Sequence, residues 1–199
     1  MEHYFIDKAH NDDDYFDYTD NILGISLTMR SVDSVFSKDK IDDGTRVLLN
    51  AIKKTSATMS GDVLDFGCGV GVIGITLKKL FPSSNVVMCD INATCVRLSK
   101  QNCIKNNVDC QVVESDLYSG LMNFDHIVTN PPIKVGKTIL FAVVSEGFKH
   151  LNKGGDITLV IRKSHGEESM RKHMQSVFGN VEIVKRDKGF YVLRSIKEK

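Results

Sequence analysis

The sequence lacks a long apolar run, because no stretch approaches the roughly 18 consecutive apolar residues that indicate a membrane-spanning helix. It also lacks internal repeats, low-complexity tracts and the basic-then-apolar N-terminal pattern of a secretory signal. We therefore expect a cytoplasmic protein that does not associate with membranes. Its 199 residues are 42% hydrophobic and 26% charged, proportions typical of a single soluble domain with a sizeable core.

Cysteine is scarce and irregularly spaced, which argues against a disulfide framework or a zinc site. The five cysteines form no C-x-x-C pair; they are Cys68, Cys89, Cys95, Cys103 and Cys110. Cys68 and Cys89 fall in apolar runs, where a free thiol packs as a small hydrophobic group. The histidines also show no metal-ligand spacing, so we predict no metal ion.

The net charge of +1 conceals an asymmetry along the chain. Residues 1–65 contain 13 acidic and 7 basic side chains, whereas residues 66–199 contain 12 acidic and 19 basic ones. An acidic N-terminal part and a basic C-terminal part would orient the protein on a polyanion such as a nucleic acid. An ordinary solvated surface explains the same numbers, so charge alone leaves the partner open.

Beyond residue 61, short β-branched runs alternate with stretches of helical apolar spacing. The runs are residues 62–66, 85–90, 110–114, 125–130, 156–161, 181–185 and 190–195. Strands separated by helices, such as those predicted over 72–80 and 139–151, pair in parallel through crossover connections. The pattern therefore predicts a doubly wound α/β sheet.

The last two runs break this rhythm, because the segment 186–189 between them is too short for a crossover helix. We expect them to form a hairpin that completes a sheet of seven strands with the last strand antiparallel. Such a Rossmann-like sheet resembles the class I methyltransferases that use S-adenosylmethionine (SAM), whereas a dinucleotide-binding sheet has six parallel strands. Residues 61–199 are therefore predicted to form a SAM-dependent methyltransferase domain.

Residues 1–60 are predicted to be an extension packed on that domain rather than a second domain. Residues 15–19 and 22–29 alternate in polarity around Asp20 and Asn21, which predicts a hairpin. Residues 41–55 show helical spacing of apolar side chains behind an acidic start.

A glycine-rich turn follows the first strand of the predicted sheet. Glycines allow a sharp turn and a close approach of the backbone to a ligand, and the next helix begins with unpaired N–H groups. Such a turn suits the amino-acid end and ribose of SAM, and Asp65 could accept a hydrogen bond from the ligand ammonium. The segment Gly69–Gly74 also satisfies the pattern G-x-G-x-x-G, so a dinucleotide site stays possible here.

Two further carboxylates end the next two strands. Asp90 is placed to bind ribose hydroxyls, and Asp116 to accept from an exocyclic amine such as adenine N6. Strand tips of an open α/β sheet meet at one ligand-binding edge. The predicted cofactor-binding residues are Asp65, Gly67, Cys68, Gly69, Gly71, Asp90, Ile91, Asp116, Leu117 and Asn130.

The segment Asn130-Pro131-Pro132-Ile133 follows the fourth strand and is the predicted catalytic loop. The prolines stiffen the loop, and the Asn130 side-chain oxygen and the Pro131 carbonyl are candidate acceptors. Two acceptors that hold the hydrogens of a planar amine can direct its delocalised lone pair at a methyl donor. The pattern thus indicates methylation of an exocyclic amine or an amide nitrogen.

With these motifs in place, residues from about 34 to 196 resemble the small-subunit ribosomal RNA guanine-N2 methyltransferases, in their short single-domain form. The matching segments are residues 35–38, 42–46, 130–137, 178–181 and 188–191. The resemblance implies transfer of a methyl group from SAM to N2 of a guanine in 16S rRNA, either as free RNA or in the small ribosomal subunit. Guanine in folded RNA must be splayed out to be reached.

Ile133 replaces the aromatic residue with which many amino-methyltransferases stack on the target base. Stacking would then come from elsewhere, and Phe36 and Tyr191 are the candidates. The predicted phosphate-holding residues are Lys134, Lys137, Arg162 and Lys163.

Three alternatives stay open from the sequence. Asn-Pro-Pro is shared with adenine-N6 and protein glutamine-N5 methyltransferases, so it specifies the reaction better than the substrate. A nicotinamide-dependent oxidoreductase would use the same glycine turn. A non-catalytic RNA-binding relative would keep the fold. The sequence does not indicate the oligomeric state or which guanine is modified.

Overall fold

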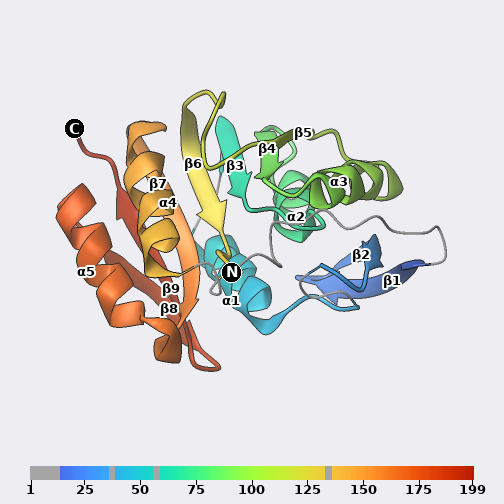
Figure 1. Cartoon of the computed structure of the whole chain (residues 1–199), viewed down its shortest axis with the longest axis horizontal. Helices are drawn as coiled ribbons and strands as arrows, with labels where there is room; N and C mark the ends of the chain where they lie inside the picture. The colour runs from blue at the N-terminus through green and yellow to red at the C-terminus, as the bar shows by residue number, and fades with distance from the viewer. Residues whose placement is uncertain (1–13, 36–38, 56–58, 133–135) are drawn as a thin grey trace.

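The computed structural model describes residues 14–35, 39–55, 59–132 and 136–199. These residues form a central seven-stranded sheet with helices on both faces and a separate two-stranded hairpin beside it (Figure 1). The predicted α/β class of the fold and its seven-stranded sheet are therefore confirmed. Within the described part of the chain, no helix is both long and apolar enough to cross a membrane.

Five strands of the sheet run parallel, because each is reached through a crossover connection. They are β3 (Asp62–Phe66), β4 (Asn85–Asp90), β5 (Gln111–Glu114), β6 (Phe124–Thr129) and β7 (Leu151–Arg162). The spatial order is β5-β4-β3-β6-β7-β9-β8. The chain thus moves outward from β3 through β4 to β5 and then returns to β6 on the other side of β3. This change of direction is where open α/β sheets form a ligand-binding crevice at the carboxyl ends of their strands.

The last two strands form the predicted hairpin, β8 (Glu182–Asp187) and β9 (Phe190–Ile196). Strand β9 inserts between β7 and β8 and is antiparallel to both. The prediction of an antiparallel last strand is confirmed.

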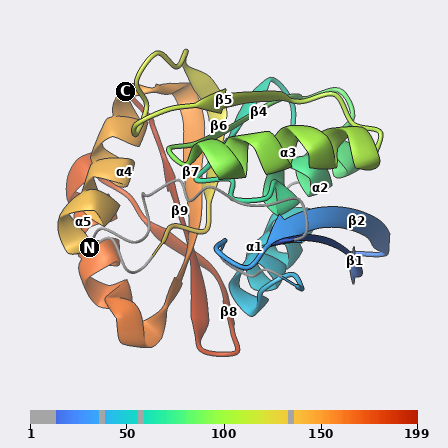
Figure 2. The same cartoon turned by 45° about the vertical axis from the view of Figure 1, so that its right-hand side comes forward.

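Helices cover both faces of the sheet (Figure 2). On one face lie α1 (Asp43–Thr55), α2 (Val72–Leu80) and α3 (Ala93–Lys105), whereas α4 (Lys137–Lys149) and α5 (Glu167–Phe178) lie on the other. Side chains alternate along β3, so that Val63 packs with the first group of helices and Leu64 with the second. Each such fully buried side chain stabilises the fold by about 1.5–3 kcal/mol.

The hairpin consists of β1 (Tyr15–Ile22) and β2 (Ile25–Val32). The sequence prediction placed its turn at Asp20 and Asn21, which is wrong: both lie inside β1, and the turn is at Leu23 and Gly24. These two residues have φ of 57° and 82°. A two-residue turn in which both φ values are positive has a twist that matches the right-handed twist of the strands it joins. The Asp20 carboxylate instead accepts a hydrogen bond from the backbone N–H of Ile41 at 2.9 Å.

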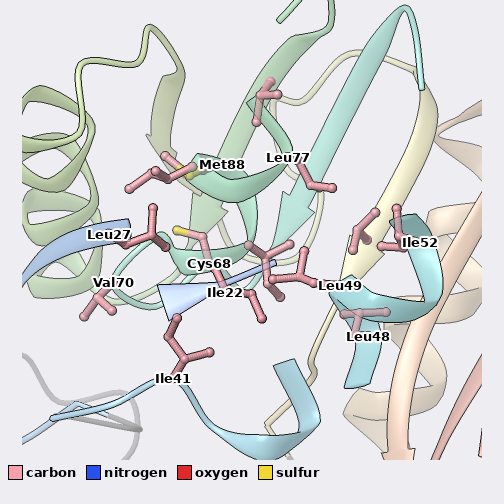
Figure 3. Close-up of a cluster of buried hydrophobic side chains, with 14 of the residues drawn as sticks. Ile22, Leu27, Ile41, Leu48, Leu49, Ile52, Cys68, Val70, Leu77 and Met88 are labelled. Atoms are coloured by element: carbon pink, nitrogen blue, oxygen red, sulfur yellow. The ribbon is translucent and has the colours of Figure 1, made fainter. Parts of the chain in front are cut away.

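The hairpin and α1 share one hydrophobic cluster with the sheet (Figure 3). Ile22 and Leu27 of the hairpin and Leu48 and Leu49 of α1 are all buried in it, together with Met88 of β4. The division of the chain into an extension and a methyltransferase domain near residue 60 stays a prediction.

Several boundaries differ from the prediction, and two of the differences have a clear physical cause. Residue 151 was assigned to a helix, but Leu151 begins β7 and pairs with Phe124 across an irregular register. Residue 41 precedes α1, because the Asp42 carboxylate accepts hydrogen bonds from the N–H groups of Gly44 and Thr45 and so starts the helix there. Cys68 and Cys89 are buried, as predicted.

Candidate active site

The glycine turn after β3 lies at the carboxyl edge of the sheet, where Gly67 and Gly69 are partly exposed. Gly67, Gly69 and Gly71 have φ of 68°, 56° and 91°, a left-handed conformation that side chains disfavour. A β-carbon at Gly67 or Gly69 would meet nothing within 4 Å, so the backbone there is accessible to a ligand. The Cys68 N–H donates to the Cys89 carbonyl at 2.9 Å, which holds the turn against the tip of β4.

Asp65 lies beneath this turn and is fully buried. One carboxylate oxygen, Oδ2, accepts a hydrogen bond from the Gly74 N–H at 2.8 Å and so anchors the first turn of α2. The other oxygen, Oδ1, has no hydrogen-bond partner among the described residues. Desolvation by burial raises the pKa of the Asp65 carboxyl to about 7, although the Gly74 N–H opposes the shift. A buried acceptor without a partner fits a ligand ammonium or a bound water.

Asp90 ends β4 and binds the glycine turn directly. Its Oδ2 accepts from the Gly69 N–H at 2.9 Å, and its Oδ1 accepts from the Asn92 N–H at 3.0 Å. Desolvation raises the pKa of this carboxyl as well. Each carboxylate oxygen has a further lone pair with which it can accept from a ribose hydroxyl. The adjacent Ile91 side chain is 39% exposed and offers an apolar surface beside the turn.

The loop after β5 lies next to Asp90, because the Ser115 N–H donates to the Asp90 carbonyl at 3.0 Å. Asp116 is exposed on this loop, and Leu117 adopts a φ of 51°. A leucine with positive φ is uncommon and indicates a loop held in place by its surroundings.

Asn130 lies immediately after β6, at the same edge of the sheet. The register pairs Asp65 with Met88 on β4 and with Val128 on β6, so the residues that follow these three strands leave the sheet side by side. Asn130 donates from Nδ2 to Thr45 Oγ1 at 3.0 Å and to Asp42 Oδ2 at 3.2 Å. With the amide nitrogen held by these two acceptors, its oxygen, Oδ1, is the end that can receive a donor.

Asp42 and Thr45 at the start of α1 were not predicted as site residues. In Figure 1 the arrowhead of β6 points toward α1, and the contacts with Asn130 show that the two elements meet there. Both residues lie in the segment 42–46, which resembles the rRNA guanine-N2 methyltransferases. That resemblance is the sequence signal that could have identified them as site residues.

With this geometry established, the sequence model that describes the "methyltransferase small domain" matches residues 26–194. The chain belongs to the methyltransferase small domain family. Membership argues against the nicotinamide oxidoreductase alternative.

Two curated relatives match most of the chain. It is 31% identical to a Bacillus subtilis protein named "Uncharacterized protein YbxB" over 98% of both chains. It is 33% identical to ribosomal RNA small subunit methyltransferase C of Colwellia psychrerythraea over 89% of this chain, but it spans only 50% of that protein. These relatives confirm the resemblance indicated by the sequence.

A similar solved structure is that of the T. thermophilus 16S rRNA N2 G1207 methyltransferase (RsmC) in complex with AdoMet and guanosine. Its TM-score is 0.83 at 26% identity, over 92% of this chain and 50% of that one. The chain therefore has the class I methyltransferase fold that the sequence predicted.

The structure describes some of the predicted substrate-binding residues of this methyltransferase but not all of them. Phe36 and Lys134 lie outside the described residues, as does Ile133 of the predicted catalytic loop. Three exposed basic residues follow or begin elements next to the site: Lys137 begins α4, Arg162 ends β7 and Lys163 follows it.

Two aromatic side chains of β9 point to opposite faces of the sheet. Phe190 lies on the α1 side, where a β-carbon at Gly44 would approach its ring to 3.1 Å. The Arg162 guanidinium lies over this ring at 4.7 Å. Tyr191 packs on the opposite side with α4 and α5, and its assignment as a base-stacking residue stays a prediction.

Proposed function

We propose that this protein binds SAM and transfers its methyl group to the exocyclic N2 of a guanine in 16S rRNA. The observation that carries the proposal is the placement of Asn130. Its amide nitrogen is held at 3.0 Å by Thr45 and at 3.2 Å by Asp42, which leaves its oxygen as an acceptor at the same edge of the sheet as the glycine turn.

The residues at the edge of the sheet fit the chemical groups of SAM. The orphaned Asp65 Oδ1 suits the ammonium, the open backbone at Gly67 and Gly69 admits the amino-acid end, and Asp90 suits the ribose hydroxyls. Ile91 offers apolar contact to a purine ring. The remaining predicted cofactor contacts are Cys68, Gly71, Asp116, Leu117 and Asn130. SAM, when bound, supplies a methyl group that is already activated by its sulfonium.

The chain contributes orientation rather than a strong base. The Asn130 oxygen and the Pro131 carbonyl would accept the two hydrogens of the guanine amine, and the adjoining Pro132 stiffens the loop. Both acceptors would draw the nitrogen lone pair out of conjugation and orient the amine toward the methyl group, and the amine would release one of its hydrogens as a proton to water. Positioning of two reactants in this way can lower the barrier by about 7–11 kcal/mol.

A nucleic-acid substrate is supported by the basic residues beside the site. Lys137, Arg162 and Lys163 are exposed and would bind phosphates that flank a splayed-out guanine. The relatives named for action on small-subunit ribosomal RNA favour this substrate over DNA. The site of action would then be the cytoplasm.

The test is methyl transfer from radiolabelled SAM to four acceptors: naked 16S rRNA, small ribosomal subunits, DNA and a peptide release factor. The RNA should come from a strain that lacks the modification. We expect label in one of the two RNA samples, and nucleoside mass spectrometry should identify it as N2-methylguanosine. Label on DNA or only on the release factor would instead support the adenine-N6 or glutamine-N5 alternative and overturn the proposal.

A further inference from the structure

The side-chain amide of Asn130 has two chemically opposite ends, and only one of them suits the proposed reaction. The oxygen accepts a hydrogen bond, whereas the NH₂ group donates. Rotation of the amide by half a turn exchanges the two ends at little steric cost. A target amine would then face a donor instead of an acceptor. Some other group must therefore fix the orientation.

Two side chains of the α1 region make the required contacts. Asn130 Nδ2 donates to Thr45 Oγ1 at 3.0 Å, to Asp42 Oδ2 at 3.2 Å and to Asp42 Oδ1 at 3.3 Å. A carboxylate is only an acceptor, so Asp42 binds the NH₂ end and would repel the oxygen end. Hydrogen bonds to a charged acceptor are stronger than those between neutral groups.

Both contacting side chains are themselves held firmly. Asp42 Oδ1 accepts from the N–H groups of Gly44 at 2.8 Å and Thr45 at 3.2 Å, which fixes the carboxylate at the start of α1. Thr45 is buried, with only 6% of its surface exposed. A β-carbon at Gly44 would lie only 3.0 Å from Asp42 Oδ1 and 3.1 Å from the Phe190 ring, so the backbone at this position is closely packed between the two. A site supported by a packed helix is held more rigidly than one on a loop.

We propose that Asp42 and Thr45 are positioning residues that set the amide orientation of Asn130, so that its oxygen faces the target amine. This inference rests on the proposed function, because it assigns a role within the same site. Asp42 and Thr45 act through Asn130 and not on the substrate.

The competing explanation is that Asp42 and Thr45 only stabilise α1. Four variants separate the two. Asp42→Ser keeps a helix-capping oxygen but is too short to reach Asn130. Thr45→Val keeps the shape of the side chain and removes its oxygen, whereas Thr45→Ser keeps the hydroxyl. Asp43→Asn is the matched control, because Asp43 is an adjacent exposed carboxylate whose partner is Lys188.

The first measurement follows Asn130 directly and needs neither SAM nor RNA. In ¹⁵N-labelled protein, the side-chain NH₂ signals of Asn130 are assigned by their loss in Asn130→Asp. In the wild type and in Asp43→Asn we expect downfield signals and slow hydrogen exchange. In Asp42→Ser and Thr45→Val they should move upfield and exchange at least about 10-fold faster, and Thr45→Ser should restore the wild-type pattern. Unchanged signals in both variants would overturn the proposal.

The second measurement is single-turnover methyl transfer with the acceptor found for the wild type. Asp42→Ser and Thr45→Val should lower the rate at least about 10-fold. This is a smaller decrease than the ~10²–10³-fold decrease caused by complete loss of one oriented polar group. SAM affinity and thermal midpoint should stay close to those of Asp43→Asn. Unaltered rates would also overturn the proposal. A wild type that does not methylate rRNA would refute the proposed substrate, while the NMR experiment would still decide the positioning role.

Discussion

Asn102 of α3 donates a hydrogen bond to the carbonyl oxygen of Val70 in the glycine turn, at a distance of 2.8 Å. The same fully buried side chain pairs with both backbone groups of Arg30 on β2, accepting from its N–H at 2.6 Å and donating to its carbonyl at 3.0 Å. One amide thus joins the edge of the hairpin to the cofactor turn. Four residues later, Asn106 pairs with Thr28 of β2 in the same manner.

This relationship predicts different effects for two similar substitutions. Asn102→Ala and Asn106→Ala each remove a pair of hydrogen bonds to the partly buried backbone of β2, so each should destabilise the protein by about 1–3 kcal/mol. Of these two asparagines, Asn102 is the one whose side chain contacts the glycine turn, so Asn102→Ala but not Asn106→Ala should also weaken SAM binding under native conditions. Urea unfolding and calorimetric titration with SAM would measure the two effects. Equal SAM affinities for the two variants would refute the proposed link between hairpin and turn.

The buried Asp65 predicts that SAM binding is coupled to a proton. Because burial raises the pKa of this carboxyl to about 7, it is protonated at pH 6 in the ligand-free protein. A ligand ammonium near Oδ1 favours the ionised form, so binding at pH 6 should release up to ~1 proton. Calorimetric titrations in buffers of different ionisation enthalpy would detect this release, and Asp65→Asn should abolish it. Binding heats that do not depend on the buffer in the wild type would contradict the predicted contact.

A second buried carboxylate, Asp156, predicts how stability depends on pH. Burial opposes its ionisation, but the hydrogen bond from His126 and the nearby Arg194 outweigh this and hold its pKa below the usual value. Its stabilising contribution is therefore present above the unfolded-state pKa of about 3.9 and is lost as the pH falls through the lower folded-state value.

Urea unfolding from pH 6 down to pH 3 tests this dependence. Asp156→Asn should cost about 1–3 kcal/mol at pH 6 and should lose less stability than the wild type as the pH falls. The matched control is Asp187→Asn, because Asp187 is an exposed carboxylate 3.5 Å from Lys185; it should change stability by less than about 0.5 kcal/mol. Parallel pH profiles of the wild type and Asp156→Asn would count against the role of Asp156.

Much of the sheet was predictable because its strands are short β-branched runs with clear ends. The bounds of β3 and β4 agree with the sequence prediction, and β6 is shifted by one residue from the predicted run 125–130, so that Asn130 follows the strand directly. The start of β7 was not predictable, because the segment after Leu151 contains two glycines and a lysine and has the composition of a loop. This segment becomes a strand because it pairs with β6, and that pairing depends on the tertiary fold rather than on the local sequence.

Asp65, Asp90 and Asp116 could be proposed from the sequence as residues near strand ends, but the contact between Asn130 and Asp42 could not. Asp42 and Asn130 are 88 positions apart in the sequence, and they meet only because α1 packs across β7, β8 and β9. Similarly, Asp65 could be identified as part of the glycine motif, whereas its anchoring of Gly74 depends on the way α2 folds back over β3.

The most direct test of the account is single-turnover methyl transfer by Asn130→Ala together with its SAM affinity. The rate should fall at least about 100-fold, since one oriented polar group is lost, while the SAM dissociation constant should stay within about 2-fold of the wild type. Asp90→Ala, which releases the Gly69 N–H, should show the opposite pattern and weaken SAM binding first. An Asn130→Ala protein that transfers methyl groups at nearly the wild-type rate would contradict the central claim that this amide holds the target amine.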